Sequence, residues 1–187
     1  MSAAQRPEGA RPAGRRAWLA AAGGIALAAG AGVAWWTRRP PAASAAAAQP
    51  LWSLQSTQPD GTPLAMAGFR GRPLLANFWA PWCPPCVEEM PLIDAFFREH
   101  RANGWQVVGL AVDRPAGVQA FLARTPVAFP VGILGMAGLS AVRALGNDAG
   151  ALPFSLVLDG RGNVHERKMG QITPEDLRRW TVQIRAA

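Results

Sequence analysis

The chain has few residues that bind metals: two cysteines and two histidines among 187 residues. A structural zinc site commonly takes four Cys or His ligands, often from two Cys-x-x-Cys pairs or from one pair with clustered histidines. This chain has a single pair, and His100 and His165 lie far from each other in the sequence. We therefore expect no zinc site and no other metal centre.

Charged residues are also scarce, at 17% of the chain against 50% hydrophobic residues. Such a composition excludes a chain that is disordered throughout. The formal net charge is +7, but six arginines lie in residues 1–49 with only Glu8 to oppose them. No basic stripe follows, whereas a nucleic-acid-binding domain presents a clustered basic face. We expect no nucleic-acid partner and one compact domain with an appendage.

Residues 17–36 carry no charged side chain and lie between pairs of arginines. A helix of about 20 residues spans the roughly 30 Å hydrocarbon core of a membrane. Trp18 and the Trp35-Trp36 pair fit the aromatic belts at the two membrane interfaces. More arginines precede the run than follow it, so the positive-inside rule keeps residues 1–16 in the cytoplasm. The sequence thus predicts a transmembrane anchor at residues 17–36 and export of the rest.

A cleaved export signal is the second interpretation of this run. Arg15-Arg16 resembles a twin-arginine signal, and residues 43–45 or 46–48 offer small-residue cleavage sites. Arg38 and Arg39 lie before those sites and argue against cleavage. A buried helix of the domain is disfavoured, because the run has no polar face. Either export interpretation places residues 51–187 in a bacterial periplasm, with residues 37–50 as a linker.

Strand and helix patterns alternate in residues 51–187. Apolar runs predict buried strands at residues 73–79, 105–112 and 154–158. Helices are expected after the cysteines, at residues 118–124, and at residues 173–184 with Thr173 as N-cap. Turn residues predict two hairpins, around residues 59–61 and 159–162, while residues 126–150 give no clear pattern. The order predicts an α/β fold whose sheet is covered on both faces.

Cys83 and Cys86 stand between the strand at residues 73–79 and the helix that follows. A structural disulfide stabilises a protein mainly by closing a long loop, and a loop of two residues constrains very little. A helix N-terminus, in contrast, stabilises the thiolate that attacks disulfides. We interpret the pair as a redox-active dithiol in which Cys83 attacks and Cys86, one turn inside, resolves the mixed disulfide.

The run NFWAPWCPPC at residues 77–86 resembles the active site of thioredoxin-fold proteins. The VEEMP that follows, and GALPFSLVLDGRGNV at residues 150–164, are similar to the membrane-tethered TlpA and ResA-like thiol-disulfide oxidoreductases. The resemblance covers about residues 51–187 and implies a thioredoxin-like fold, a central mixed sheet with helices on both faces. It also implies disulfide exchange with exported proteins, an upstream membrane electron donor, and no cofactor.

The same resemblance implies roles for four further residues. Trp82 would shield the nucleophile, and Leu152 would offer backbone groups to an extended substrate chain. Pro153 falls where the family has a cis-proline packed against the dithiol. Asn77 occupies the position where cytosolic thioredoxins keep a buried acid near the resolving thiol, so proton transfer in this chain must come from elsewhere.

Glu89 is the candidate general base, because it lies three residues after Cys86 and so on the same helical face. Glu88 is rotated away from that face and is expected to be solvated. A partly buried Glu89 could accept the proton of Cys86. The alternative is a surface carboxylate that only favours the helix N-terminus.

Pro84 and Pro85 indicate the direction of the reaction, because neither has a backbone N–H. Cys86 is then the only residue of this turn that can donate to the Cys83 thiolate, so the pKa of Cys83 should fall only modestly. A weakly stabilised thiolate favours a reductant, for example in cytochrome c maturation or copper-site assembly.

Two other functions are alternatives for this cysteine pair. A peroxiredoxin-type peroxidase would have Thr or Ser three residues before its reactive cysteine, where this chain has Ala80. A copper chaperone could use Cys83, Cys86 and His165, although related copper-delivery proteins space their cysteines by three residues.

Overall fold

The computed structural model describes residues 46–184. Within them, seven strands form one sheet in the order β2-β1-β5-β4-β3-β6-β7. The strands are β1 (Gln55–Thr57), β2 (Pro63–Ala65), β3 (Leu74–Trp79), β4 (Gln106–Ala111), β5 (Val131–Ile133), β6 (Phe154–Leu158) and β7 (Val164–Met169). The α-helices are α3 (Gln49–Trp52), α4 (Pro84–His100), α5 (Pro115–Arg124), α6 (Gly138–Ala144) and α7 (Pro174–Gln183). Short 3-10 helices are η1 (Met66–Phe69), η2 (Arg101–Asn103) and η3 (Gly135–Ala137).

The segment predicted to be an anchor or a signal, residues 17–36, lies outside the described residues. Among residues 46–184, none of the helices has both the length and the apolar character needed to cross a membrane. Packed structure begins before the Leu51 expected from the sequence, because Ala48 is fully buried and α3 starts at Gln49. The last residues assigned to the linker thus belong to the fold.

The three central strands are mixed in direction. β3 runs parallel to β4 and antiparallel to β6, and every residue of the three is buried. Strands covered on both faces need apolar side chains on both faces, which explains why their sequences are almost continuous apolar runs. The expected strands are thereby confirmed, and so is the mixed sheet.

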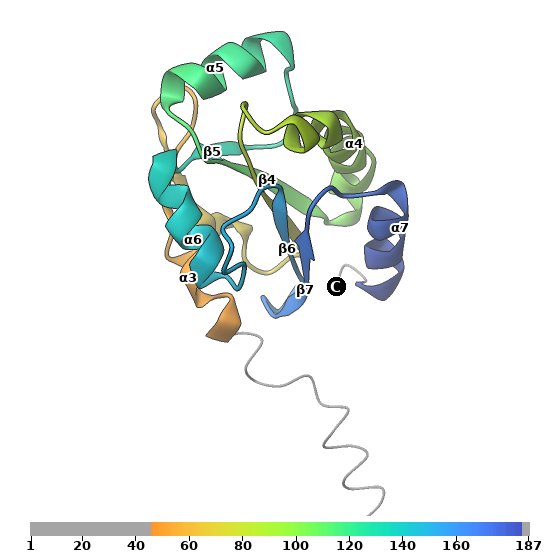
Figure 1. Ribbon diagram of the computed structural model, residues 1–187. Helices are drawn as coiled ribbons and strands as arrows, with labels where there is room; N and C mark the ends of the chain where they lie inside the picture. Colours follow the sequence, from red (N-terminus) through yellow and green to blue (C-terminus); the bar gives the residue numbers. More distant parts are fainter. Residues whose placement is uncertain (1–45, 185–187) are drawn as a thin grey trace, which may run out of the picture. The chain divides into compact units, whose positions relative to one another are not determined.

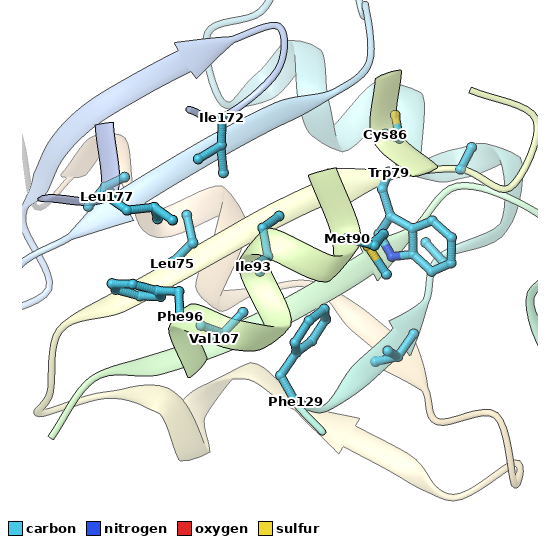
Figure 2. Packing of buried hydrophobic residues seen from close by; sticks show 14 of the residues in the cluster. Leu75, Trp79, Cys86, Met90, Ile93, Phe96, Val107, Phe129, Ile172 and Leu177 are labelled. Carbon is cyan, nitrogen blue, oxygen red and sulfur yellow. The ribbon is translucent and has the colours of Figure 1, made fainter. Parts of the chain in front are cut away.

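Helices cover both faces of this sheet, α4 and α7 on one and α3 and α6 on the other (Figure 1). One core cluster joins the sheet to α4, α5 and α7, and its labelled members in Figure 2 include Leu75, Met90 and Ile93. The other cluster joins the opposite face to α3 and α6. The alternation of side chains along each strand therefore assigns odd-numbered residues of β3 to the α4 face.

The two expected hairpins are present. β1 and β2 pair antiparallel on either side of the turn at residues 59–61, and β6 and β7 pair antiparallel at the other edge of the sheet. Residues 126–150, which had no clear pattern, contain β5 and α6. β5 has only three residues and runs parallel to β4. Its other side pairs antiparallel with β1, so β5 links the central strands to the N-terminal hairpin.

Candidate active site

The cysteine pair lies where the central strand β3 gives way to α4. Cys83 is the N-cap of α4 and its backbone is extended, while Cys86 is in the first turn of the helix. The two form a disulfide with a Cα–Cα distance of 5.3 Å. Cys86 is fully buried, whereas Cys83 keeps 5% of its surface exposed. Cys83 is thus the more exposed of the two, and its role as the attacking sulfur stays a prediction.

Two prolines separate these sulfurs. Pro84 and Pro85 occupy the first two positions of α4, where a proline's fixed φ suits the start of a helix. An N-cap side chain is normally hydrogen-bonded by the N–H of the second or third helical residue. Pro85 cannot donate, so Cys86 is the remaining donor in this turn. Cys83 accepts no capping hydrogen bond in the disulfide form.

Three residues that the resemblance assigns to the site, Trp82, Leu152 and Pro153, differ in exposure and in backbone geometry. Trp82 is 54% exposed, which is unusual for so large an apolar side chain. The Leu152–Pro153 peptide bond is cis, as expected for Pro153. Gly170 donates its N–H to the carbonyl of Pro153 at 2.9 Å and ties this loop to the end of β7. Leu152 is half-buried and contacts both core clusters.

Glu89 lies in α4 and is only 1% exposed. Its Oε1 accepts a hydrogen bond from Asn77 Nδ2 at 2.8 Å, and its Oε2 accepts one from the backbone N–H of Ile172 at 2.6 Å. Burial raises the pKa of Glu89, although these two donors and the charge of Lys168 lower it in part. The interpretation of Glu89 as a surface carboxylate is therefore wrong. Its partner Ile172 belongs to the segment between β7 and α7.

Asn77 connects this carboxylate to the sheet. It lies in the middle of β3, fully buried, and its amide also donates to the hydroxyl of Ser155 in β6 at 3.0 Å. Its Oδ1 accepts no hydrogen bond from the described residues. The position that holds an acid in cytosolic thioredoxins thus holds a neutral amide whose donors fix a glutamate from the helix.

The other candidates lie apart from the pair. Glu88 is exposed, as expected, and His100 ends α4. His165 is the extra residue of a bulge between β6 and β7, beside Leu158. Leu158 pairs with Leu74, the first residue of β3, whereas Cys83 follows the last residue of β3. His165 and Cys83 therefore lie toward opposite ends of the strands. The described residues contain no group of three His, Cys, Asp or Glu side chains placed to hold a metal.

Sequence reasoning missed three contributors to the site: Ser155, the backbone N–H of Ile172, and Lys168. A signal for Ser155 existed, because it is the single polar residue in the apolar run FSLVL, as Asn77 is in LLANFW. A lone polar side chain in a buried strand needs a hydrogen-bonding partner. Nothing in the sequence alone points to Ile172, which lies far along the chain from Glu89.

The comparison with protein families decides the assignment: the model of the family described as Redoxin matches residues 41–180. The chain belongs to the Redoxin family. Thiol-disulfide oxidoreductase ResA of Bacillus thuringiensis (strain Al Hakam) is 30% identical over 122 residues, covering 65% of this chain and 68% of that protein. This Redoxin protein is therefore also a homologue of the ResA-like oxidoreductases, which confirms the resemblance.

Solved structures agree on the fold. The structure of MTB dsbF in its mixed oxidized and reduced forms has a TM-score of 0.62 at 25% identity, covering 72% of this chain and 96% of that one. A thiol:disulfide interchange protein of the thioredoxin family from Chlorobium tepidum TLS has a TM-score of 0.61 at 27% identity, covering 70% and 91%. The Redoxin protein thus has a thioredoxin-like α/β fold and is a thiol-disulfide oxidoreductase with the pair Cys83 and Cys86.

Proposed function

We propose that this oxidoreductase works as a reductant of disulfides in exported proteins. The observation that carries the proposal is the composition of the first turn of α4, where Cys83 is the N-cap and two prolines follow. A strong oxidant stabilises its reduced thiolate heavily. Here the dipole of α4 remains, but Pro85 removes one of the two N–H donors that usually reach an N-cap side chain. The reduced form is stabilised less, so the dithiol tends to give its electrons away.

The reaction proceeds in two exchanges. The Cys83 thiolate attacks one sulfur of the substrate disulfide, a mixed disulfide forms, and the other substrate sulfur leaves as a thiolate. Cys86 then attacks the Cys83 sulfur, which releases the second substrate sulfur. Two electrons pass from the dithiol to the substrate, and the product is the Cys83–Cys86 disulfide seen in the structure.

The second exchange requires Cys86 to lose its proton in a buried site. Glu89 is the general base that we assign to this step, because it lies one helical turn after Cys86 on the same face. Burial raises the pKa of Glu89, which improves its ability to accept a proton near neutral pH. Asn77 and Ile172 each hold one carboxylate oxygen and so fix the orientation of the base.

Substrate binding is assigned to the exposed surface beside Cys83. Trp82 covers the nucleophile on one side, and Leu152 and Pro153 offer an edge along which an extended polypeptide can lie. The support is the exposure of Trp82 and the absence of any hydrogen bond, within residues 46–184, to the backbone groups of Leu152. An extended chain that pairs with free backbone groups is a common mode of peptide recognition.

The proposed cellular setting rests on the sequence of residues 17–36. A membrane anchor at residues 17–36, or a cleaved signal there, would place the enzyme in the periplasm. A reductant in an oxidising compartment needs a membrane donor of electrons to return Cys83 and Cys86 to the thiol form. Apocytochrome c and copper-site assembly factors are the substrate classes proposed.

Trapping tests the function directly. In Cys86→Ala, Cys83 can form the mixed disulfide but cannot resolve it, so substrates should accumulate as covalent adducts in the envelope fraction. The adducts should disappear on treatment with a reductant and be absent from the matched Cys83→Ala variant. The purified protein should have a reduction potential closer to the about −270 mV of thioredoxin than to the about −120 mV of a strong oxidant. A potential near the latter value would contradict the proposed direction.

The pH profile tests the base. Glu89→Gln keeps the shape of the side chain but cannot accept the proton, so the resolving step should slow and lose its dependence on the Glu89 titration. Glu88→Gln, on the exposed side of the same helix, is the matched control and should keep the wild-type profile. An unchanged profile in Glu89→Gln would remove the base role and leave the disulfide exchange itself standing.

A further inference from the structure

A polar row crosses the sheet on the face that α4 and α7 cover. Asn77 pairs with Ser155 between β3 and β6, and Ser155 pairs with Lys168 between β6 and β7. Residues directly opposite each other in neighbouring strands share a face. The three side chains therefore lie in line, from the fully buried centre of the sheet to its edge strand.

Each end of the row contacts one carboxylate. At the inner end, Asn77 donates to Glu89. At the outer end, the Lys168 ammonium lies 2.9 Å from Asp176 Oδ2 of α7, and the side chains of Lys168 and Asp176 are 26% and 7% exposed. Asp176 also completes a capping box with Thr173. The ammonium is therefore held in place at the border between the buried carboxylate and the solvent.

The groups around Glu89 come from several elements. Asn77 of β3 and the backbone N–H of Ile172 bond its carboxylate, and Ser155 of β6 accepts a hydrogen bond from Asn77. Cys86 lies one turn earlier in its own helix. β7 contributes the charge of Lys168, with Asp176 of α7 as the counter-charge beyond it. Burial raises the pKa of Glu89, and the Lys168 charge is one of the influences that lower it. Lys168 is the only lysine in the chain.

We infer that Lys168 is a positioning residue for disulfide exchange: its ammonium, anchored by Asp176, acts through Glu89 and keeps the buried carboxylate ionised so that it can accept the Cys86 proton. The inference rests on the proposed base role of Glu89. It adds a residue that touches neither the sulfurs nor the substrate.

The arrangement suits a base better than a direct ion pair would. A lysine bonded to Glu89 would stabilise the carboxylate so strongly that it would lose its affinity for protons. The two oxygens of Glu89 instead take neutral N–H donors from Asn77 and Ile172, while the ammonium forms its ion pair with Asp176. The field of Lys168 then offsets only part of the cost of burying the charge.

The test measures Glu89 and the reaction separately. In the oxidised protein, the carboxyl ¹³C signal of Glu89 gives its titration midpoint. In the reduced protein, the rate of disulfide exchange is measured against pH, and the acid limb of this profile is the pH range in which the rate falls as the base becomes protonated. Lys168→Gln should move both to higher pH, because an uncharged neighbour no longer favours the carboxylate. Lys168→Arg should restore both, since it keeps the charge.

Arg179→Gln is the matched control. Arg179 contacts the same Asp176, at 3.0 Å from Oδ1, but is not among the groups that shift the pKa of Glu89. This variant loses the ion pairs of Arg179 with Asp176 and with Glu166 of β7, and should leave both readouts in place. Because Lys168 is the only lysine, its side-chain ammonium and methylene signals are unambiguous, and they should show a titration step that Glu89→Gln abolishes.

Two outcomes overturn the inference in distinguishable ways. If Lys168→Gln leaves the Glu89 midpoint where it is, or Arg179→Gln moves it equally, the charge of Lys168 does not act on Glu89, and the base role stands on its own test. If the midpoint moves while the acid limb stays, the carboxylate feels Lys168 but does not limit the exchange. That result removes both the inference and the proposed base.

Discussion

The side-chain amide of Asn77 donates a 2.8 Å hydrogen bond to the carboxylate of Glu89 and so joins the central strand to the helix that carries the cysteines. Both residues are buried, at 0% and 1% exposure. An ionised carboxylate accepts hydrogen bonds and donates none, so an amide N–H is a suitable buried partner for it. The pair also explains why an asparagine, rather than an acid, fits at the centre of β3.

We predict that Asn77→Asp destabilises the folded protein by about 3 kcal/mol at neutral pH, because it leaves two buried carboxylates facing each other. The raised pKa of such a pair means that stability is present in acid and is lost as the pH rises. Urea unfolding at several pH values measures the effect. In a Glu89→Gln background the new aspartate faces an amide donor, so the penalty should shrink; equal penalties in both backgrounds would rule out the contact as the cause.

We predict that Glu89 makes the stability of the oxidised protein fall with rising pH. Its pKa in the fold is raised above the ordinary value of 4.5, chiefly by burial. The folded state therefore binds its proton more tightly than the unfolded chain does. Its contribution is complete below the unfolded pKa and is lost as the pH rises through the folded value. Urea unfolding should show wild type losing stability relative to Glu89→Gln over this window, and parallel curves would contradict the prediction.

The sequence predicts most of the fold because several strands and helices have clear local sequence patterns. The three central strands are continuous apolar runs, and Thr173-Pro174 marks the start of α7, where the capping box with Asp176 is found. β5 could not be predicted, because three residues give no periodicity and its place beside β4 depends on the rest of the sheet. α6 has only seven residues, and it too lies in the segment that gave no clear pattern.

Part of the site can also be predicted from local sequence, and part depends on residues far apart in the chain. Cys83, Cys86 and Glu89 follow from spacing along one helix. The burial of Glu89 does not, because it depends on Ile172, a residue 83 positions away that donates to the carboxylate. The place of Lys168 depends on register: the bulge at His165 sets which residues of β7 face α4, and a shift of one residue would turn Lys168 to the other face.

We predict that Gly109→Ala lowers the free energy of unfolding by about 1–3 kcal/mol through overpacking. Gly109 lies in β4 opposite Asn77, and a Cβ there would stand 2.9 Å from Phe129 Cε2 and 3.1 Å from Trp79 Nε1. Both rings are buried and have little room to move. Gly68→Ala is the control, because its Cβ would meet nothing within 4 Å. Chemical denaturation should separate the two variants, and similar losses in both would point to the backbone instead of the contact.

We predict that Pro85→Ala makes the dithiol more oxidising, whereas Pro84→Ala has little effect. Pro85 occupies the second position of α4, from which a backbone N–H reaches the side chain of the N-cap, here Cys83. A new hydrogen bond to the thiolate, at about 1.5 kcal/mol, stabilises the reduced form and raises the reduction potential by about 30 mV. The pKa of Cys83 should fall in parallel. Equilibration with glutathione measures the potential, and thiolate absorbance against pH measures the pKa.

The Pro84→Ala variant is the control for the loss of a proline, because the backbone N–H of the first helical residue does not reach the N-cap side chain. Equal shifts in the two variants would mean that the prolines act through the rigidity of the turn, and the argument from missing donors would fail.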